Sequence, residues 1–262
     1  MNSWSRRRKR IILSILIFIV VVLIGVPMFF LFYRAPTCFD ARQNGDEAGV
    51  DCGGGCQLLC SAESLPLLVK GDARVLTLAT STYQVVALVS NANASAEIYR
   101  AGYTLRLFST SSSIPVKVIE GFSYVPKGSE FVIFEGPFTL EADVVPVRAT
   151  LEWKEETLIW NKNSADALAL VAAEPAFSRL ETSPRLEAVI KNVSLESASN
   201  IDLSALVYDA DGNIFAASKS FIDLLQPGAE SRAIFTWPKA FDREPARTEI
   251  IIRVFPDRSF VR

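Results

Sequence analysis

The 262-residue chain contains no histidine. This absence excludes Ser-His-Asp and Cys-His catalysis, and also any metal site built on imidazole. The sequence also lacks the G-x-S-x-G, G-x-x-x-x-G-K-[ST] and G-x-G-x-x-G patterns of nucleophile elbows and phosphate-binding loops. A carboxylate pair or a Ser-Lys dyad would still suffice for hydrolysis, but no spacing singles one out. We therefore expect a protein that is not an enzyme.

Basic residues are scarce beyond the N-terminal region. Six of the 27 lie within residues 1–34, where there is no acidic residue, so residues 35–262 hold 21 basic against 29 acidic ones and carry a net charge of −8. A nucleic-acid surface needs clustered lysines and arginines. We therefore expect no nucleic-acid partner.

One long apolar run stands out, from Ile11 to Tyr33, without a single charge. At ~1.5 Å rise per residue such a helix crosses a hydrocarbon core of ~30 Å. Because Arg6, Arg7, Arg8, Lys9 and Arg10 precede the run, the positive-inside bias makes residues 1–10 a cytoplasmic tag and 11–33 a transmembrane helix. The sequence thus predicts a single-pass protein of the cell membrane with an extracytoplasmic C-terminal region.

The alternative is a cleaved signal peptide, which also begins with a basic region. The apolar run is longer than the ~7–15 residues of a signal core, and no small-x-small site follows it. Either alternative leaves the remaining chain outside the cytoplasm.

All four cysteines, Cys38, Cys52, Cys56 and Cys60, lie in a short segment that we place at 35–61. An even number of cysteines in an oxidising compartment indicates two disulfides, with three pairings open. A zinc site is the weaker alternative, because the 13, 3 and 3 residues between the cysteines do not give a C-x₂₋₄-C pair on both sides, and the chain has no histidine. A segment this short cannot bury a core, so covalent bridges must hold it.

The same segment carries a candidate calcium loop. Asp40, Asn44, Asp46 and Asp51 stand at positions 1, 5, 7 and 12 of a twelve-residue span, and Gly45 stands at position 6. Arg42 at position 3 departs from the pattern, as does the short Asp51 at position 12. The alternative is that these side chains cap turns in a bridged loop. Calcium is therefore the one candidate cofactor, and none is certain.

The segment resembles a cysteine motif of bacterial and archaeal surface proteins, C-x-D-G-x-x-N-G-x-E-x-G-x-D-C-G-G-x-C. Ala41 replaces the first glycine of the motif. The resemblance implies a surface location rather than an activity. The matching residues are Asp40, Asn44, Gly45, Glu47, Gly49, Asp51, Cys52, Gly53, Gly54 and Cys56.

From Leu67 onward the pattern is strand-like. Apolar residues alternate with polar ones in Tyr103–Leu107 and again in Ile201–Val207. A period of two predicts strands with one buried face, and many short strands separated by turn signals indicate β-sandwiches. We expect an all-β ectodomain.

An internal repeat indicates two copies. A shift of 100 residues aligns Leu105–Phe108 with Ala205–Tyr208, Gly128 with Gly228, and Val86 with Leu186. This period is a domain duplication, because solenoid repeats run ~20–50 residues. We place β-sandwich 1 at 67–160 and β-sandwich 2 at 165–258, with the join near 161–164.

The second copy resembles the FxLYD family of immunoglobulin-like bacterial domains over residues 185–240. Asn192 ends a strand, a hairpin from Tyr208 to Gly212 follows with Asp211-Gly212 as its tight turn, and Leu225–Gly228 precedes the next strand. Ala205 and Val207 replace the Phe and Leu of the family name. The resemblance implies a binding or spacer module without catalytic residues.

These features together predict two tandem immunoglobulin-like β-sandwiches outside the membrane, used for binding, adhesion or envelope scaffolding. The expected partners are the membrane and an unidentified protein or surface ligand. One alternative is a subunit of a periplasmic or secretion assembly, whose membrane helix packs with other subunits. Another is an undetected hydrolase.

Overall fold

The computed structural model describes residues 3–32, 37–110 and 113–256 of the chain. It divides into two compact units, residues 1–56 and residues 57–262. Each unit is described by itself.

The first unit begins with helix α1 (Ser3–Phe32). Its stretch Arg7–Phe29 is long and apolar enough to span a membrane, and none of it is buried by the rest of the chain. The predicted apolar helix is therefore confirmed, and it fits an anchor or a signal peptide equally. Tyr33, the last residue of the predicted span, lies outside the described residues.

The second unit contains all the named strands, and every strand pairing is antiparallel. In one sheet of β-sandwich 1, the central strand β3 pairs with β6 on one side and with both β1 and β2 on the other. In the second sheet, the central strand β4 lies between β5 and β7, and β8 pairs with the first residues of β4. A short 3-10 helix, Glu155–Thr157, follows β7. The strands are β1 (Leu68–Val69), β2 (Arg74–Ala79), β3 (Thr82–Ser90), β4 (Ala96–Ser109), β5 (Lys117–Val125), β6 (Glu130–Thr139), β7 (Pro146–Trp153) and β8 (Asn161–Lys162).

β-sandwich 2 repeats the order of six of these strands and, among the described residues, has no counterpart of β1 or β8. Its sheets have the orders β13-β10-β9 and β12-β11-β14, which correspond to β6-β3-β2 and β5-β4-β7. The shared order supports the duplication that the sequence indicates. The strands are β9 (Leu170–Ser178), β10 (Arg185–Asn192), β11 (Ala198–Tyr208), β12 (Ile214–Leu225), β13 (Glu230–Thr236) and β14 (Arg247–Val254).

Each sandwich has its own apolar core. Leu105 and Leu107 of β4 lie in the first core, and Leu203 and Ala205 of β11 lie in the second. Alternate residues of both strands face the core of their own sandwich, as the period of two predicts. The alignment of Val86 with Leu186 is wrong by one residue, because the inward residues of β3 and β10 differ in number by 101. These inward residues are Val85, Ala87 and Val89 in β3, and Leu186, Ala188 and Ile190 in β10.

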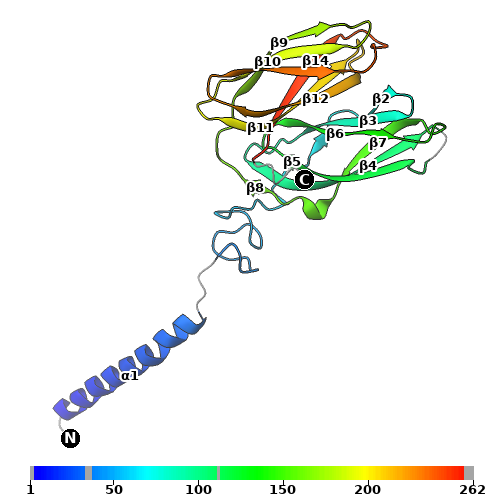
Figure 1. Ribbon diagram of the computed structural model, residues 1–262. Coiled ribbons are helices and arrows are strands. Elements are labelled where there is room, and N and C mark those ends of the chain that lie inside the picture. The colour runs from blue at the N-terminus through cyan, green and yellow to red at the C-terminus, as the bar shows by residue number, and fades with distance from the viewer. Residues whose placement is uncertain (1–2, 33–36, 111–112, 257–262) are drawn as a thin grey trace. The chain divides into compact units, whose positions relative to one another are not determined.

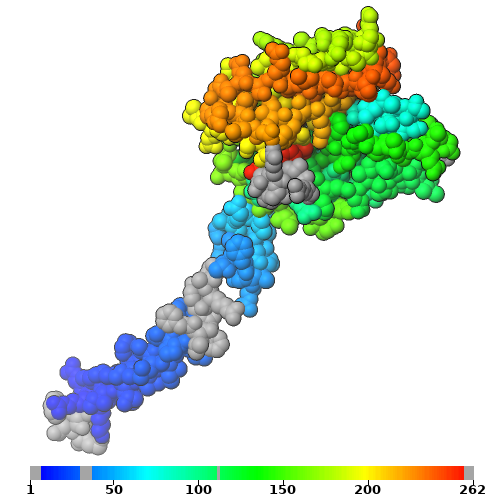
Figure 2. Space-filling model, viewed as in Figure 1, coloured from blue at the N-terminus to red at the C-terminus, as the bar shows by residue number. Residues whose placement is uncertain are grey.

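A third apolar cluster joins the two sandwiches. It packs the outer face of β2-β3-β6 against the outer face of β12-β11-β14, so that four sheets lie in layers (Figure 1). The space-filling view shows the residues of the two sandwiches in direct contact (Figure 2). The buried members of this cluster, called the inter-sandwich interface below, are Leu76, Val86, Leu88, Val132, Leu206, Tyr208 and Ala217.

The two middle sheets are consequently covered on both faces. Residues Tyr83 to Val89 of β3 are all buried, and so are Leu203 to Tyr208 of β11. The prediction of one buried face is wrong for these two strands. The continuous apolar run Val85–Val89 is the sequence signal for this burial, because a strand covered on both sides does not alternate.

Two smaller predictions are also corrected. Asn161 and Lys162, where the sequence placed the join, form β8 and pair with Glu97 and Ala96 of β4. In the hairpin after Tyr208 only Gly212 has a positive φ. The five-residue loop is organised instead by Asp209, whose Oδ1 accepts hydrogen bonds from the backbone N–H groups two and four residues later.

Candidate functional site

All four cysteines are disulfide-bonded. Cys38 and Cys56 form one bridge with a Cα–Cα distance of 5.6 Å, within the usual range of ~4.4–6.8 Å. Cys52 and Cys60 are also in a disulfide, and no cysteine is free. Of the three pairings that the sequence allows, the structure therefore has the one that contains Cys38–Cys56.

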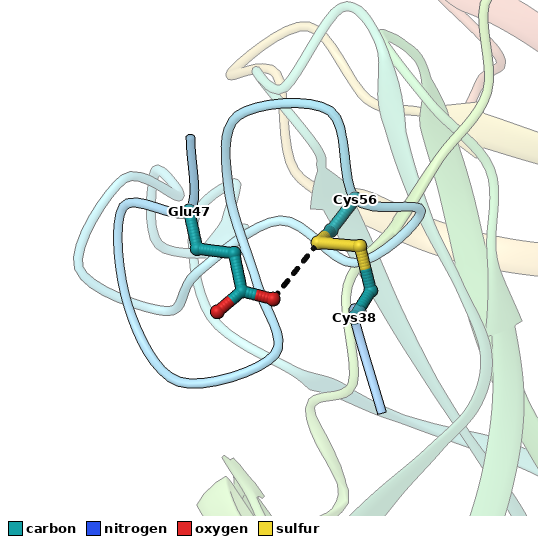
Figure 3. Close-up of side chains that lie close together, drawn as sticks. All are labelled: Cys38, Glu47 and Cys56. Carbon is teal, nitrogen blue, oxygen red and sulfur yellow. Dashed lines mark hydrogen bonds between the residues drawn. A yellow bond between two sulfur atoms is a disulfide. The ribbon is translucent and has the colours of Figure 1, made fainter. Parts of the chain in front are cut away.

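Glu47 lies beside the Cys38–Cys56 bridge (Figure 3). Its Oε1 is 3.4 Å from the Sγ of Cys56. A disulfide sulfur has neither a proton to donate nor the thiolate charge that binds a metal, so we read this as a van der Waals and dipolar contact. Cys38, Glu47 and Cys56 have their possible metal-ligand atoms within 4.8 Å of one another. They are the one such group of cysteine and carboxylate side chains within residues 3–32, 37–110 and 113–256.

The structure brings together three of the four candidate calcium ligands. Asp51 Oδ1 accepts a hydrogen bond from the backbone N–H of Asp40 at 2.9 Å. Asp40 Oδ2 accepts one from Asn44 Nδ2 at 2.9 Å. Asn44 Oδ1 is enclosed and has no hydrogen-bond partner within the described part of the chain.

The fourth candidate, Asp46, faces a different turn. Its Oδ2 accepts a hydrogen bond from the backbone N–H of Gly55 at 2.9 Å. Gly54 has a φ of 48°, and a Cβ at that position would lie 1.9 Å from the carbonyl oxygen of Asp46. The glycine run therefore wraps closely around Asp46, as the turn-cap alternative expects. Calcium binding stays a prediction, and it requires Asp46 to turn away from Gly55.

A cleft of about 440 Å³ lies between the two sandwiches. Charged and aromatic side chains from both sandwiches line it. Its lining residues include Tyr103, Tyr124 and Glu135 from β-sandwich 1, and Asp202, Lys219 and Arg253 from β-sandwich 2.

Arg253 of β14 is the central cation of this cleft and is 8% exposed. Its Nη2 lies 3.1 Å from Asp202 Oδ2. Its Nη1 donates to Ser123 Oγ at 2.9 Å and to the carbonyl oxygen of Tyr124 at 3.3 Å. One guanidinium thus joins a carboxylate of its own sandwich to two oxygens of the other. Planar, multidentate hydrogen bonding of this kind is specific to arginine.

A second cation, Lys219, extends the network. Its Nζ lies 3.9 Å from Asp202 Oδ2 and 5.1 Å from the ring centroid of Phe134. Burial lowers the pKa of Lys219 and the nearby Arg253 charge adds to this effect, whereas Asp202 opposes it. The two cations therefore share one carboxylate, which favours the charged form of both.

Two tyrosines of β-sandwich 1 complete the network. The Tyr103 hydroxyl donates to Glu135, and the Tyr124 hydroxyl donates to Glu97 Oε2 at 2.6 Å. Burial raises the pKa of both tyrosines, and the carboxylate that accepts each hydrogen bond raises it further. Each phenol is consequently held neutral as a donor. The network joins groups of both sandwiches through Arg253.

The sequence reasoning did not single out this network. Its one usable signal was Arg253, a charged residue inside the apolar run Ile250–Phe255. A charge in such a run indicates a buried partner, but the partner Asp202 lies 51 residues away.

Comparisons with known proteins add no functional assignment. No protein-family model matches the chain. No curated protein matches it either. Among solved structures, red sea bream transglutaminase is similar over 76% of this chain and 31% of that chain, with 11% identity and a TM-score of 0.21. A TM-score this low carries no argument about function, and the likeness to the FxLYD family stays a prediction.

Proposed function

We propose that the chain is a single-pass membrane protein whose two sandwiches form a binding or scaffolding module outside the cytoplasm. The observation that carries the proposal is the doubly disulfide-bonded segment that follows the apolar helix. Disulfides persist in oxidising compartments and are rare in the cytoplasm. The bridges therefore favour an extracytoplasmic position for everything after α1.

The charge distribution supports the same orientation. Arg6–Arg10 precede the apolar stretch, whereas residues 35–262 are net acidic. Basic residues stay preferentially on the cytoplasmic side. The acidic remainder suits a module that is held beside an anionic membrane without adhering to it.

The proposed role is non-enzymatic. The chain has no histidine, and several polar groups that line the inter-sandwich cleft bond to one another. Arg253 is bonded to Asp202, and the Tyr103 hydroxyl to Glu135. A catalytic group would need to face the substrate.

A second candidate function is that of a subunit in an envelope or secretion assembly. It is favoured by α1, because none of the apolar stretch Arg7–Phe29 is buried. Apolar membrane helices of this kind pack against helices of other subunits.

Protease accessibility tests the proposed orientation. The full chain, with different epitope tags at its two ends, is expressed in bacterial cells that are then converted to spheroplasts. Added protease should remove the C-terminal tag and spare the N-terminal one. A cleaved signal peptide would instead release a soluble form that lacks the N-terminal tag.

A thiol assay provides the control. Without reductant, maleimide should label none of the four cysteines, whereas a Ser64→Cys variant should be labelled from outside. A protected C-terminal tag together with four reactive thiols would place the sandwiches in the cytoplasm and contradict the proposal.

A further inference from the structure

Strand β14 has an unpaired edge. It ends the sheet β12-β11-β14, and among the described residues it forms a ladder with β11 alone. The backbone N–H of Phe255 donates to the carbonyl of Asn200 at 3.1 Å, which makes these two a hydrogen-bonded pair. Bonded and non-bonded pairs alternate in an antiparallel ladder. Thr248, Ile250 and Ile252 therefore direct their N–H and C=O groups away from β11.

An apolar groove of about 440 Å³ runs beside this edge, between β9 and β14. Glu130 is the only charged residue among the described residues that line it, and it is paired with Lys70 at 2.5 Å. The groove is continuous with the core of β-sandwich 2, because several of its lining residues pack against that core. These residues are Leu170 and Ala172 of β9, and Ile250 and Ile252 of β14.

Neighbouring edges carry protection that β14 lacks. In β9 the register shifts at a bulge where Glu174 has a φ of 54° and Pro175 follows. Bulges and prolines prevent an edge strand from accepting a further strand. In β-sandwich 1 the strand equivalent to β14 is β7, and its Ala149 forms a bridge with Ala73. β14 instead presents Ile250–Ile252 in succession.

We propose that β14 accepts an extended segment of a partner polypeptide that has apolar side chains at alternate positions. The free edge presents alternating N–H and C=O groups with opposite partial charges, and an extended backbone is their complement. Successive side chains of a strand point to opposite faces. Every second side chain of the partner therefore enters the apolar groove.

A second copy of this chain is a poorer occupant. Its own β14 would satisfy the backbone groups, but its Ile250 and Ile252 are already packed in their own core. They cannot also fill the groove of another copy. The segment must therefore come from a region that is not part of a folded sandwich.

The inference identifies the edge of β14 as the surface for the proposed binding role. It does not depend on the membrane orientation of the chain. Protease accessibility tests the orientation, and the measurements below test the edge. Failure of one is therefore distinguishable from failure of the other.

Hydrogen exchange on the full chain in detergent tests whether the edge is open. The amides of Thr248, Ile250 and Ile252 should exchange faster than those of Glu249 and Ile251, which bond to β11. The probe is a synthetic peptide of alternating Val and Thr with a Lys at each end. It should slow the three outward amides. If those amides are already slow without the peptide, the edge is occupied and the proposal is wrong.

Two N-methylated peptides supply a matched comparison. One carries N-methyl groups on its Val residues and the other on its Thr residues, so each blocks the hydrogen bonds along one edge. One of them should bind like the parent peptide, and the other at least tenfold more weakly, about 1.4 kcal/mol. Equal affinity of the two would overturn strand addition.

The matching change in the protein is Thr248→Pro, with Thr248→Val as its control. Proline removes an outward N–H that β11 does not use, whereas valine keeps it. We expect Thr248→Pro to weaken peptide binding at least tenfold, and Thr248→Val to change it less than twofold. If Thr248→Pro does not fold, the two N-methylated peptides still decide the question.

Discussion

At the scale of single residues, one buried asparagine recurs in each sandwich. Asn192 is 0% exposed, and its Nδ2 donates to the carbonyl oxygens of Glu196 and Leu225 at 2.8 and 2.9 Å. Asn91 makes the equivalent bonds with the carbonyls of Ala96 and Pro126, at 2.9 and 2.8 Å. In both sandwiches the amide ties the end of one strand to the beginning of the next strand and to a turn.

We expect Asn192→Ala to destabilise the protein by about 1–3 kcal/mol, because it leaves buried carbonyls without a partner. Urea unfolding of the full chain in detergent measures the change. The control is Lys191→Ala, which removes an exposed ion pair with Glu230 and should cost less than about 1 kcal/mol. Equal midpoints for the two variants would contradict the assigned role.

The buried tyrosines predict a loss of stability in alkali. Burial and a neighbouring carboxylate raise the pKa of Tyr103, Tyr124 and Tyr208 in the folded protein. The pKa of tyrosine in the unfolded chain is about 10. Below this pH the three tyrosines contribute fully to the free energy of unfolding, and above it their contribution is lost as the pH rises. Urea midpoints should therefore fall from about pH 9 upward.

Tyr124→Phe is the variant that tests this assignment. The variant lacks a phenol that stays protonated at higher pH in the folded protein than in the unfolded chain. The free energy of unfolding should therefore fall less steeply with pH above about 10. The free energy at neutral pH should also drop, because Glu97 loses the donor at 2.6 Å. An unchanged slope would mean that Tyr124 titrates normally in the folded state.

At the scale of elements, β11 shows how the inter-sandwich interface contributes to stability. Leu206 is 0% exposed, although its side chain points away from the core of its own sandwich and lies in the interface. We expect Leu206→Ala to cost about 2–5 kcal/mol, the range for buried leucines. Leu224→Ala on β12 is the control, because Leu224 is 54% exposed. If Leu206→Ala lowers the free energy of unfolding no more than Leu224→Ala does, the sandwiches do not pack together in solution.

The core-facing residues of single strands could be predicted from the sequence. The packing of one sandwich against the other could not. The inward residues of β4 and β11 follow from a local period of two. Burial of the opposite face depends on contacts between segments more than 100 residues apart, such as Gln84 Nε2 donating to the Ala217 carbonyl at 2.8 Å. The same limit applies to the cleft, since Arg253 and Ser123 meet only in the folded chain.

At the scale of the whole molecule, the covalent bridges and the packed cores are separate. Both disulfides lie within residues 38–60, and the cores of the sandwiches contain none. Reduction with dithiothreitol should therefore leave the β-sheet circular dichroism and the urea midpoint of the full chain nearly unchanged. It should make residues 38–56 sensitive to protease, since such bridges contribute roughly 3 kcal/mol to a loop of this length. Loss of the β-sheet signal on reduction would contradict this separation.

The residues that lead into β-sandwich 1 are bonded to those that lead out of it. The backbone N–H of Leu59 donates to Trp160 O at 3.0 Å, and that of Lys162 donates to Gln57 O at 2.8 Å. The two segments are antiparallel, because Leu58 forms an antiparallel bridge with Asn161.

This arrangement has a mechanical consequence. Suppose that the chain is stretched between helix α1 and a partner bound to β-sandwich 2. The force then acts first on the hydrogen bond from Lys162 N–H to Gln57 O, and afterwards on the bond from Leu59 N–H to Trp160 O. While these bonds hold, they carry the force past most of β-sandwich 1, in parallel with the inter-sandwich interface. Under load the molecule should lengthen in a first small step, when this short ladder opens, before either core unfolds.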